Sequence, residues 1–391
     1  MMKDDRGQLI FLALFRMTRS IAAGMITIAF PYLVLTDRHY SPLQLGLLYT
    51  SAAIATAILG LLFGFLTDSW GRGKTLFLVG LLLPVSSIIV FFSSGLPALF
   101  IATSMGGYSA TGSLAEGGVG GAAQPIQNAV ITDLTTSENR TSYFSILTFL
   151  SGMFGALGAL LAKHAGIQDV FLYATLISGA GLVFLAFIKT GYVRGNLRRL
   201  HSKMVIGKFT VTGILNGFTA GLVVPFLIPF FVIVYHVPKS EMAVYAFASG
   251  MLAAFAILAA PRLEQTLGFV KSIAVTRGLG TVLLLLLPFW HVYAIALAIY
   301  LITPSLRVMA VPVQRTALTE MVQRDELGRA LGINQVARLG ASSGGISLTG
   351  YLFNISEIAA PFCIYAVAMA ANIYLYFRFF RPGHRAGLKK G

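Results

Sequence analysis

Among the charged side chains that interrupt long apolar runs of this sequence, four are candidates for function. Arg16 and Arg19 lie three residues apart in the first run, and Arg307 lies near the middle of a later one. Glu116 is the only carboxylate well inside such a run, if that stretch lies within the membrane. Arginine favours an anionic or polar ligand by charge complementarity, and a carboxylate in low dielectric has a raised pKa that suits proton coupling. Because ionisable residues within a membrane are costly and by default functional, all four are candidates for substrate binding or coupling.

Neutral amide side chains within apolar runs complete the candidate site: Gln124, Gln127, Asn216 and Gln314. The alternative for each amide is a hydrogen bond that only joins two helices. The alternative for Arg16 and Arg19 is that the charged group extends along its helix toward the membrane surface.

The composition is that of an integral membrane protein. Of 391 residues, 56% are hydrophobic and 11% are charged, whereas a soluble domain averages about 25% charged residues. The net charge of +15 comes mainly from the polar connections, so membrane orientation explains it better than binding to nucleic acid. The single cysteine, Cys363, excludes a disulfide framework and a cysteine metal cluster. We expect no cofactor and no metal.

The apolar runs predict an all-α fold of twelve transmembrane helices, because about 20 apolar residues cross a bilayer as a helix. They lie at about residues 8–35, 44–66, 75–93, 98–134, 142–163, 168–189, 206–235, 242–261, 271–288, 291–321, 329–352 and 358–380. Most lysines and arginines fall in the termini and in the connections that share their side. We therefore expect a multi-pass protein of the plasma membrane, embedded in lipid, with both termini cytoplasmic.

The longest polar connection, 190–207, divides the chain into two six-helix bundles. The first bundle is 1–189, the connection is a cytoplasmic linker, and the second bundle is 208–391 with a basic cytoplasmic tail. Duplicated halves with a midplane binding site between them are a known transporter architecture.

A short internal repeat supports this division. Gln127 recurs 187 residues later as Gln314, and Asp133 recurs as Glu320 at the same spacing. The same offset places the counterpart of Arg307 one helical turn from Glu116. We therefore expect a Glu116–Arg307 pair that forms and breaks as the transporter opens. The alternative is that Glu116 lies in an external loop.

The fourth span is too long for one membrane helix. Residues 98–134 would extend about 55 Å at 1.5 Å per residue, and the stretch is rich in glycine. We expect an irregular or broken segment around 104–121 and a helix that starts near Pro125. This segment either faces the substrate or is an external loop.

A glycine-punctuated polar stretch between the second and third spans carries a family resemblance. Gly64, Asp68, Gly71 and Arg72 match the loop that joins helices 2 and 3 of the major facilitator superfamily, while Lys74 takes a base position shifted by one residue. We predict a tight cytoplasmic turn here. The resemblance implies the major facilitator fold, with two pseudo-symmetric bundles and usually one functional monomer.

The resemblance also implies gating roles. In the family the loop arginine reaches the acid that ends helix 4, which makes Arg72–Asp133 a candidate gate contact. Glu320 ends the tenth span at the equivalent place. The remaining gate candidates from this loop are Gly64, Asp68, Gly71 and Lys74.

The function expected from this resemblance is secondary active transport of a small solute by alternating access. We expect coupling to protons and an anionic or polar substrate. The alternative is a proton-driven exporter of amphipathic drugs, although span 5 lacks the proline of the motif that such antiporters usually carry. A non-transporting membrane sensor is a further alternative. No phosphate-binding loop or catalytic constellation occurs in the sequence, so we do not expect an enzyme.

Overall fold

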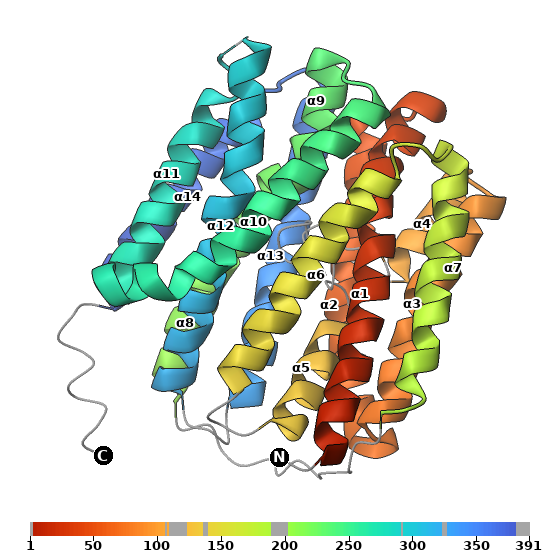
Figure 1. Cartoon of the computed structure of the whole chain (residues 1–391). Helices are drawn as coiled ribbons and strands as arrows, with labels where there is room; N and C mark the ends of the chain where they lie inside the picture. The colour runs from red at the N-terminus through yellow and green to blue at the C-terminus, as the bar shows by residue number, and fades with distance from the viewer. Residues whose placement is uncertain are drawn as a thin grey trace.

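The computed structural model describes residues 3–105, 108, 123–135, 140–188, 202–290, 292–322 and 327–380. The elements of these ranges are all helical. The described chain starts and ends at the same end of the helical bundle (Figure 1). We call this the proximal end and the opposite one the distal end.

The first group of helices, named here the N-half, comprises α1 to α7. Their bounds are α1 (Lys3–Tyr32) with a π-helical turn η1 (Leu33–Asp37), α2 (Pro42–Trp70), α3 (Arg72–Phe92), α4 (Leu96–Ser104), α5 (Ala123–Leu134), α6 (Arg140–Leu161) and α7 (Ile167–Leu185). The fourth predicted span therefore contains two short helices. The helix expected near Pro125 begins at Ala123, and most of the segment 104–121 lies outside the described residues.

The second group, named here the C-half, comprises α8 to α14. Their bounds are α8 (Lys203–Val223), η3 (Val224–Phe226), α9 (Leu227–Tyr235), α10 (Lys239–Leu267), α11 (Phe269–Leu286), α12 (Tyr293–Met321), α13 (Leu327–Asn354) and α14 (Ala360–Phe379). Helix α8 begins inside the stretch expected as a linker, of which residues 190–201 lie outside the described part. The domain limits otherwise stay a prediction.

Within the described ranges, ten helical segments are long and apolar enough to cross a membrane. The two predicted spans not among them are the α4–α5 pair, whose pieces have 9 and 12 residues, and α13. Helix α13 carries Asn334, Gln335 and Arg338 and several serines and glycines, which lower its hydropathy. Each of the twelve predicted spans nevertheless contains a helix.

The chain reverses within the stretch from Gly64 to Lys74, as the tight turn predicted there requires, but most of the stretch is helical. Helix α2 continues to Trp70 and α3 starts at Arg72, so that Gly71 alone, at φ 87°, reverses the chain. Gly73 lies inside α3. At 29 residues α2 is about 44 Å long and exceeds the ~30 Å hydrocarbon layer, so its polar end stays helical beyond the layer. Gly268, at φ 74°, joins α10 to α11 in the same way.

Close helix crossings occur at equivalent places in the two halves. A methyl group on Gly24 of α1 would overlap the backbone of Gly155 in α6, and one on Gly221 of α8 would overlap Ser342 in α13. Gly221 follows Gly24 by 197 residues, and Ser342 follows Gly155 by 187. Backbones that touch in this way require small residues at the crossing.

The two halves pack through α2 against α13 and through α6 against α10. Near the distal end, Gly46 and Gly350 bring the backbones of α2 and α13 together. About one turn deeper, the hydroxyls of Thr50 and Ser347 are 2.7 Å apart. These contacts join the halves in the distal part of the bundle.

Candidate functional site

Arg19 lies near the middle of α1 and is buried inside the N-half. Its side chain is 2% exposed, and its Nε and Nη1 atoms have no hydrogen-bond partner in the part of the chain that the structure describes. It lies about 24 Å along the helix from Lys3 at 1.5 Å per residue. The guanidinium does not reach the protein surface, so the alternative in which it extends toward the membrane surface is wrong for this residue.

Arg16, one turn earlier, is also buried. It is 6% exposed, and its Nε donates a hydrogen bond to Ser151 Oγ of α6 at 3.2 Å. This bond ties α1 to α6 directly below the Gly24–Gly155 crossing.

Gln127 of α5 is a further buried polar group of the N-half whose hydrogen-bonding atoms are open, as are the hydroxyls of Thr56, Ser87 and Ser94. Its side chain is fully buried, and both its amide nitrogen and its amide oxygen are without a partner among the described residues. The adjacent Ile126 packs in an apolar cluster with Leu12 and Phe15 of α1. A buried amide without hydrogen bonds destabilises a fold by roughly 1–3 kcal/mol, so such a group points to a ligand.

The remaining predicted substrate residues are not assembled into one described cluster. Arg307 lies half-buried at the middle of α12, and Asn216 lies half-buried in α8. Glu116 and the side chain of Gln124 lie outside the described residues, so the Glu116–Arg307 pair stays a prediction.

Sequence reasoning missed a buried arginine in the C-half, Arg277 of α11. It is 5% exposed and donates hydrogen bonds to Asn372 Oδ1 at 2.6 Å and to Gln314 Oε1 at 3.1 Å. Its guanidinium carbon lies 5.1 Å from the ring centroid of Tyr376. The signal was available, because Arg277 interrupts the apolar run 271–288 as plainly as Arg19 interrupts the first run.

The Arg277 network connects four helices. Asn372 of α14 donates from its amide nitrogen to the Thr212 carbonyl of α8 at 2.8 Å, and Gln314 belongs to α12. Gln314, expected at the substrate site, thus has its carbonyl oxygen occupied by Arg277. Within the described residues this arginine fastens α8, α12 and α14 to α11.

At the proximal end, Arg72 connects the start of α3 to α5. Its Nη1 donates to the Ala129 carbonyl at 2.9 Å, one turn before Asp133. The side chains of Asp133, Asp68 and Glu320 lie outside the described residues, so the Arg72–Asp133 contact stays a prediction. Gly64 and Lys74 are exposed.

At the distal end, Lys239 links the halves. Its Nζ donates to the carbonyl of Ala162, at 2.7 Å, and to that of Ala165, both just after the last turn of α6. Tyr32 adds a second link, because its hydroxyl donates to the Val237 carbonyl at 2.6 Å. The Tyr32 side chain therefore ties α1 to the connection between α9 and α10.

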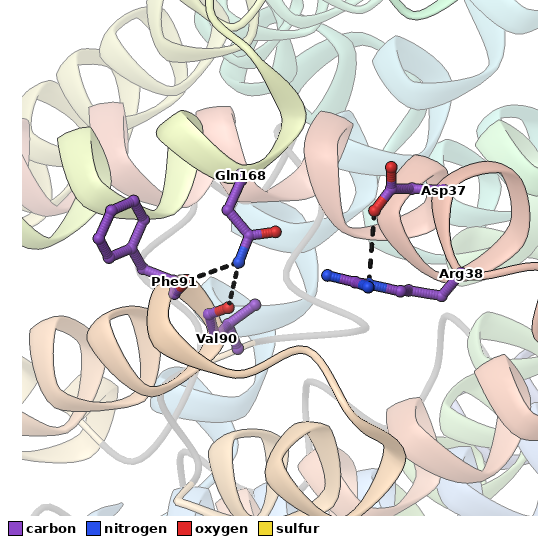
Figure 2. A network of polar contacts seen from close by, with 5 residues as sticks. All are labelled: Asp37, Arg38, Val90, Phe91 and Gln168. Atoms are coloured by element: carbon purple, nitrogen blue, oxygen red, sulfur yellow. Dashed lines mark hydrogen bonds and ion pairs between the residues drawn. The ribbon is translucent and has the colours of Figure 1, made fainter.

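Two further distal contacts lie within the N-half (Figure 2). Gln168 of α7 donates to the carbonyls of Val90 and Phe91, at 3.0 and 2.5 Å, and so caps the end of α3. Asp37 and Arg38 form an exposed ion pair at 3.4 Å. Metal binding has no support in the described ranges, where no group of three or more histidine, cysteine or acidic side chains is found.

Comparison with known proteins adds the family. The model described as Major Facilitator Superfamily matches residues 12–337 of the chain. Over 169 residues the chain is 32% identical to the "Major facilitator superfamily multidrug transporter mfsB" of Aspergillus fumigatus, a match that covers 40% of this chain and 26% of that protein. The chain thus matches about a quarter of the length of this relative.

Solved structures show the same fold across nearly the whole chain. The human organic anion transporter MFSD10 (TETRAN) aligns with a TM-score of 0.73 at 14% identity, over 95% of this chain and 99% of that chain. A D-xylose-proton symporter aligns with a TM-score of 0.71 at 16% identity, over 96% and 97% of the two chains. At these identities the likeness concerns the fold alone.

Proposed function

Because the chain belongs to the Major Facilitator Superfamily, a family of membrane transporters, we propose that it carries an anionic solute across the membrane by alternating access. Arg19 is the principal binding residue in this proposal. Gln127 and Arg16 assist it from α5 and from the preceding turn of α1.

The observation that carries the proposal is that Nε and Nη1 of buried Arg19 have no hydrogen-bond partner among the described residues. A buried charge needs a partner, because its desolvation penalty amounts to several kcal/mol per ion. A guanidinium presents a planar fork of donors that matches a carboxylate or a phosphate. A bound anion would therefore both accept hydrogen bonds from the open donors of Arg19 and neutralise its positive charge.

Alternating access and membrane orientation complete the proposal. Both termini face the cytoplasm of a plasma-membrane protein that acts as a monomer, so the distal contacts of Lys239 and Tyr32 close the outer side. The substrate then enters or leaves from the proximal side in this conformation. Coupling to protons through Glu116, expected from the sequence, stays a prediction.

A second candidate function is export of amphipathic drugs. It is favoured by the partial match to a relative named as a multidrug transporter. This function would place a cation beside Glu116 and would leave Arg19 without a counter-charge.

Ligand-induced thermal stabilisation of the purified protein distinguishes anion transport from drug export. We expect succinate, benzoate or inorganic phosphate to raise the melting temperature, because a ligand that binds only the folded state stabilises it. Arg19→Met should abolish the shift, while Arg262→Met, at an exposed arginine of α10, should keep it. Stabilisation by ethidium instead, retained in Arg19→Met and lost in Glu116→Gln, would contradict the anion proposal and support the exporter.

A further inference from the structure

The two buried arginines of α1 lie between two separate apolar clusters. On the proximal side, Phe15 belongs to a cluster of buried residues that all lie between Leu9 and Ile188. On the distal side, Ile26 and Phe30 belong to a second cluster, called here the distal cluster. The buried face of α1 therefore changes from charged at Arg19 to apolar within the next two turns.

The apolar residues that follow Arg19 lie on its own face of the helix. Ala22, Ala23, Ile26 and Phe30 come 3, 4, 7 and 11 residues after it, spacings that keep side chains on one face of an α-helix. We call these four residues the apolar stripe. Its first two members are alanines, whose methyl groups occupy little space next to the arginine, and its last two are buried. From Arg19 to Phe30 the helix rises about 17 Å at 1.5 Å per residue.

Aromatic rings close the distal end of the apolar stripe and join the two halves there. The ring centroid of Phe30 lies 5.6 Å from that of Tyr49 in α2, and Tyr49 lies 6.4 Å from Phe226 in η3. Phe226 belongs to the C-half and Tyr49 to the N-half, so the distal cluster lies between the halves. A solute carried by alternating access binds between the halves. Its body is therefore expected on the distal side of Arg19, along the apolar stripe.

We propose that the transported anion is an amphipathic monocarboxylate, with its carboxylate on Arg19 and its apolar body along the apolar stripe. The open donors of Arg19 accept one end of such a molecule, and the stripe covers the other end with hydrocarbon. A second charge at the far end would be buried among apolar side chains, which costs several kcal/mol per ion. This inference rests on the proposed function and adds the class of its anion.

The experiment titrates acetate, butyrate, hexanoate, octanoate and dodecanoate against the purified protein and follows thermal stabilisation. We expect the half-saturating concentration to fall about fourfold per methylene, which corresponds to ~0.8 kcal/mol for each buried methylene. The gain should stop before dodecanoate, because Phe30 and its ring neighbours end the stripe. Partition into detergent would instead continue to increase with chain length.

Dicarboxylates of equal carbon number test the apolar end separately from the carboxylate. Succinate is compared with butyrate, and octanedioate with octanoate. In each pair the dicarboxylate should bind at least about tenfold more weakly, because its second carboxylate finds no donor along the stripe.

One variant alters the stripe and a second serves as its control. Ala23→Leu places a larger side chain next to Arg19, so octanoate should bind at least about tenfold more weakly while acetate binds as before. Ile10→Ala changes an apolar side chain of the same helix that is 60% exposed, and both anions should bind as in the parent. The series of anions on the parent protein tests the proposal even if Ala23→Leu does not fold.

The outcomes distinguish this inference from the proposed function. Half-saturating concentrations that do not depend on chain length, or octanedioate that binds as tightly as octanoate, would overturn the amphipathic class and leave anion binding standing. A gain that continues through dodecanoate would overturn it as well. Stabilisation by octanoate that survives in Arg19→Met, or failure of every anion including inorganic phosphate, would overturn the proposed function itself.

Discussion

Two buried arginines, Arg19 in the N-half and Arg277 in the C-half, are treated by the fold in opposite ways. They are exposed to 2% and 5%, so burial does not distinguish them. Arg277 donates to two amide oxygens and faces a tyrosine ring. Arg19 has two donor atoms without a partner in the described chain. The comparison teaches that two arginines of equal burial can differ in hydrogen bonding: Arg277 holds helices together, whereas the open donors of Arg19 support the ligand-binding role that we propose for it.

The internal repeat makes this contrast sharper. Gln127 and Gln314 are 187 residues apart and occupy equivalent helices. Gln314 accepts from Arg277, but the residue 197 positions before Arg277 is Gly80, so Gln127 receives no such donor. The two halves therefore share the arrangement of their helices but differ in the hydrogen bonds of their buried polar side chains.

Arg19→Met is expected to have the largest effect. Transport of the anion should fall about a hundredfold or more, since removing one partner of a buried charge pair costs about 3–5 kcal/mol. The unliganded protein should nevertheless melt at a higher temperature, because a buried unpaired charge has been replaced by an apolar side chain. Lower stability together with normal transport would break the comparison.

Arg277→Met should have the opposite pair of effects: a large loss of stability and a small loss of transport. It leaves the amide oxygen of buried Asn372 and that of half-buried Gln314 without this donor, at roughly 1–3 kcal/mol for a buried acceptor and less for a half-buried one. We expect a loss of about 2–4 kcal/mol of stability, seen in thermal unfolding without ligand, and only a secondary loss of transport. Arg277→Lys, which restores one donor, should recover part of the stability. An Arg277→Met protein as stable as the parent would show that the network does not fasten the C-half.

Gly71→Ala and Gly268→Ala test the shared frame. Both glycines have positive φ, where a non-glycine residue is strained by about 1–3 kcal/mol. The two variants should therefore lower the melting temperature by similar amounts, whatever the chemistry of their halves. Gly60→Ala, inside α2 where a Cβ meets nothing within 4 Å, is the control and should be neutral or stabilising. Strongly unequal losses at the two turns would contradict a common frame.

Lys239→Met should give the smallest effect, a loosening of the distal end. The ammonium forms charge-assisted hydrogen bonds at the end of α6, where the helix dipole is negative. The probe is a single cysteine, introduced as Thr50→Cys in a Cys363→Ser background. We expect this cysteine to react with a maleimide up to about tenfold faster when Lys239→Met is also present, a factor that corresponds to ~1.4 kcal/mol.

The matched control is Lys163→Met, because Lys163 lies beside the same helix end and its side chain, unlike its backbone N–H, donates no hydrogen bond among the described contacts. Its effect on labelling should be negligible. Equal labelling in both variants would remove Lys239 from the contacts that close the distal end.

Much of the fold could be predicted from the sequence, because the length of an apolar run reports directly on a membrane helix. The polar stretch at Gly64–Lys74 misled this reasoning, since helix ends that project beyond the hydrocarbon layer can be polar and still helical. The single reversal point, Gly71, depends on one backbone angle that composition does not encode.

The site was less predictable because hydrogen bonding is a tertiary property. Arg277 finds its partners 95 and 37 residues away, in helices that no local pattern brings together. The sequence likewise could not reveal that Arg19 is left open while Arg16 reaches Ser151. It did place Arg19 and Gln127 among the candidates, because polar groups inside apolar runs are rare.

The glycine crossings have a consequence for how such a protein can change over evolutionary time. At Gly24–Gly155 and at Gly221–Ser342 the helix axes are set by backbone touching backbone. The path of these helices is thus independent of the larger side chains that line the interior. Substitutions at Arg19, Gln127 or Asn216 can therefore give a daughter lineage a new cargo while the moving framework is inherited unchanged.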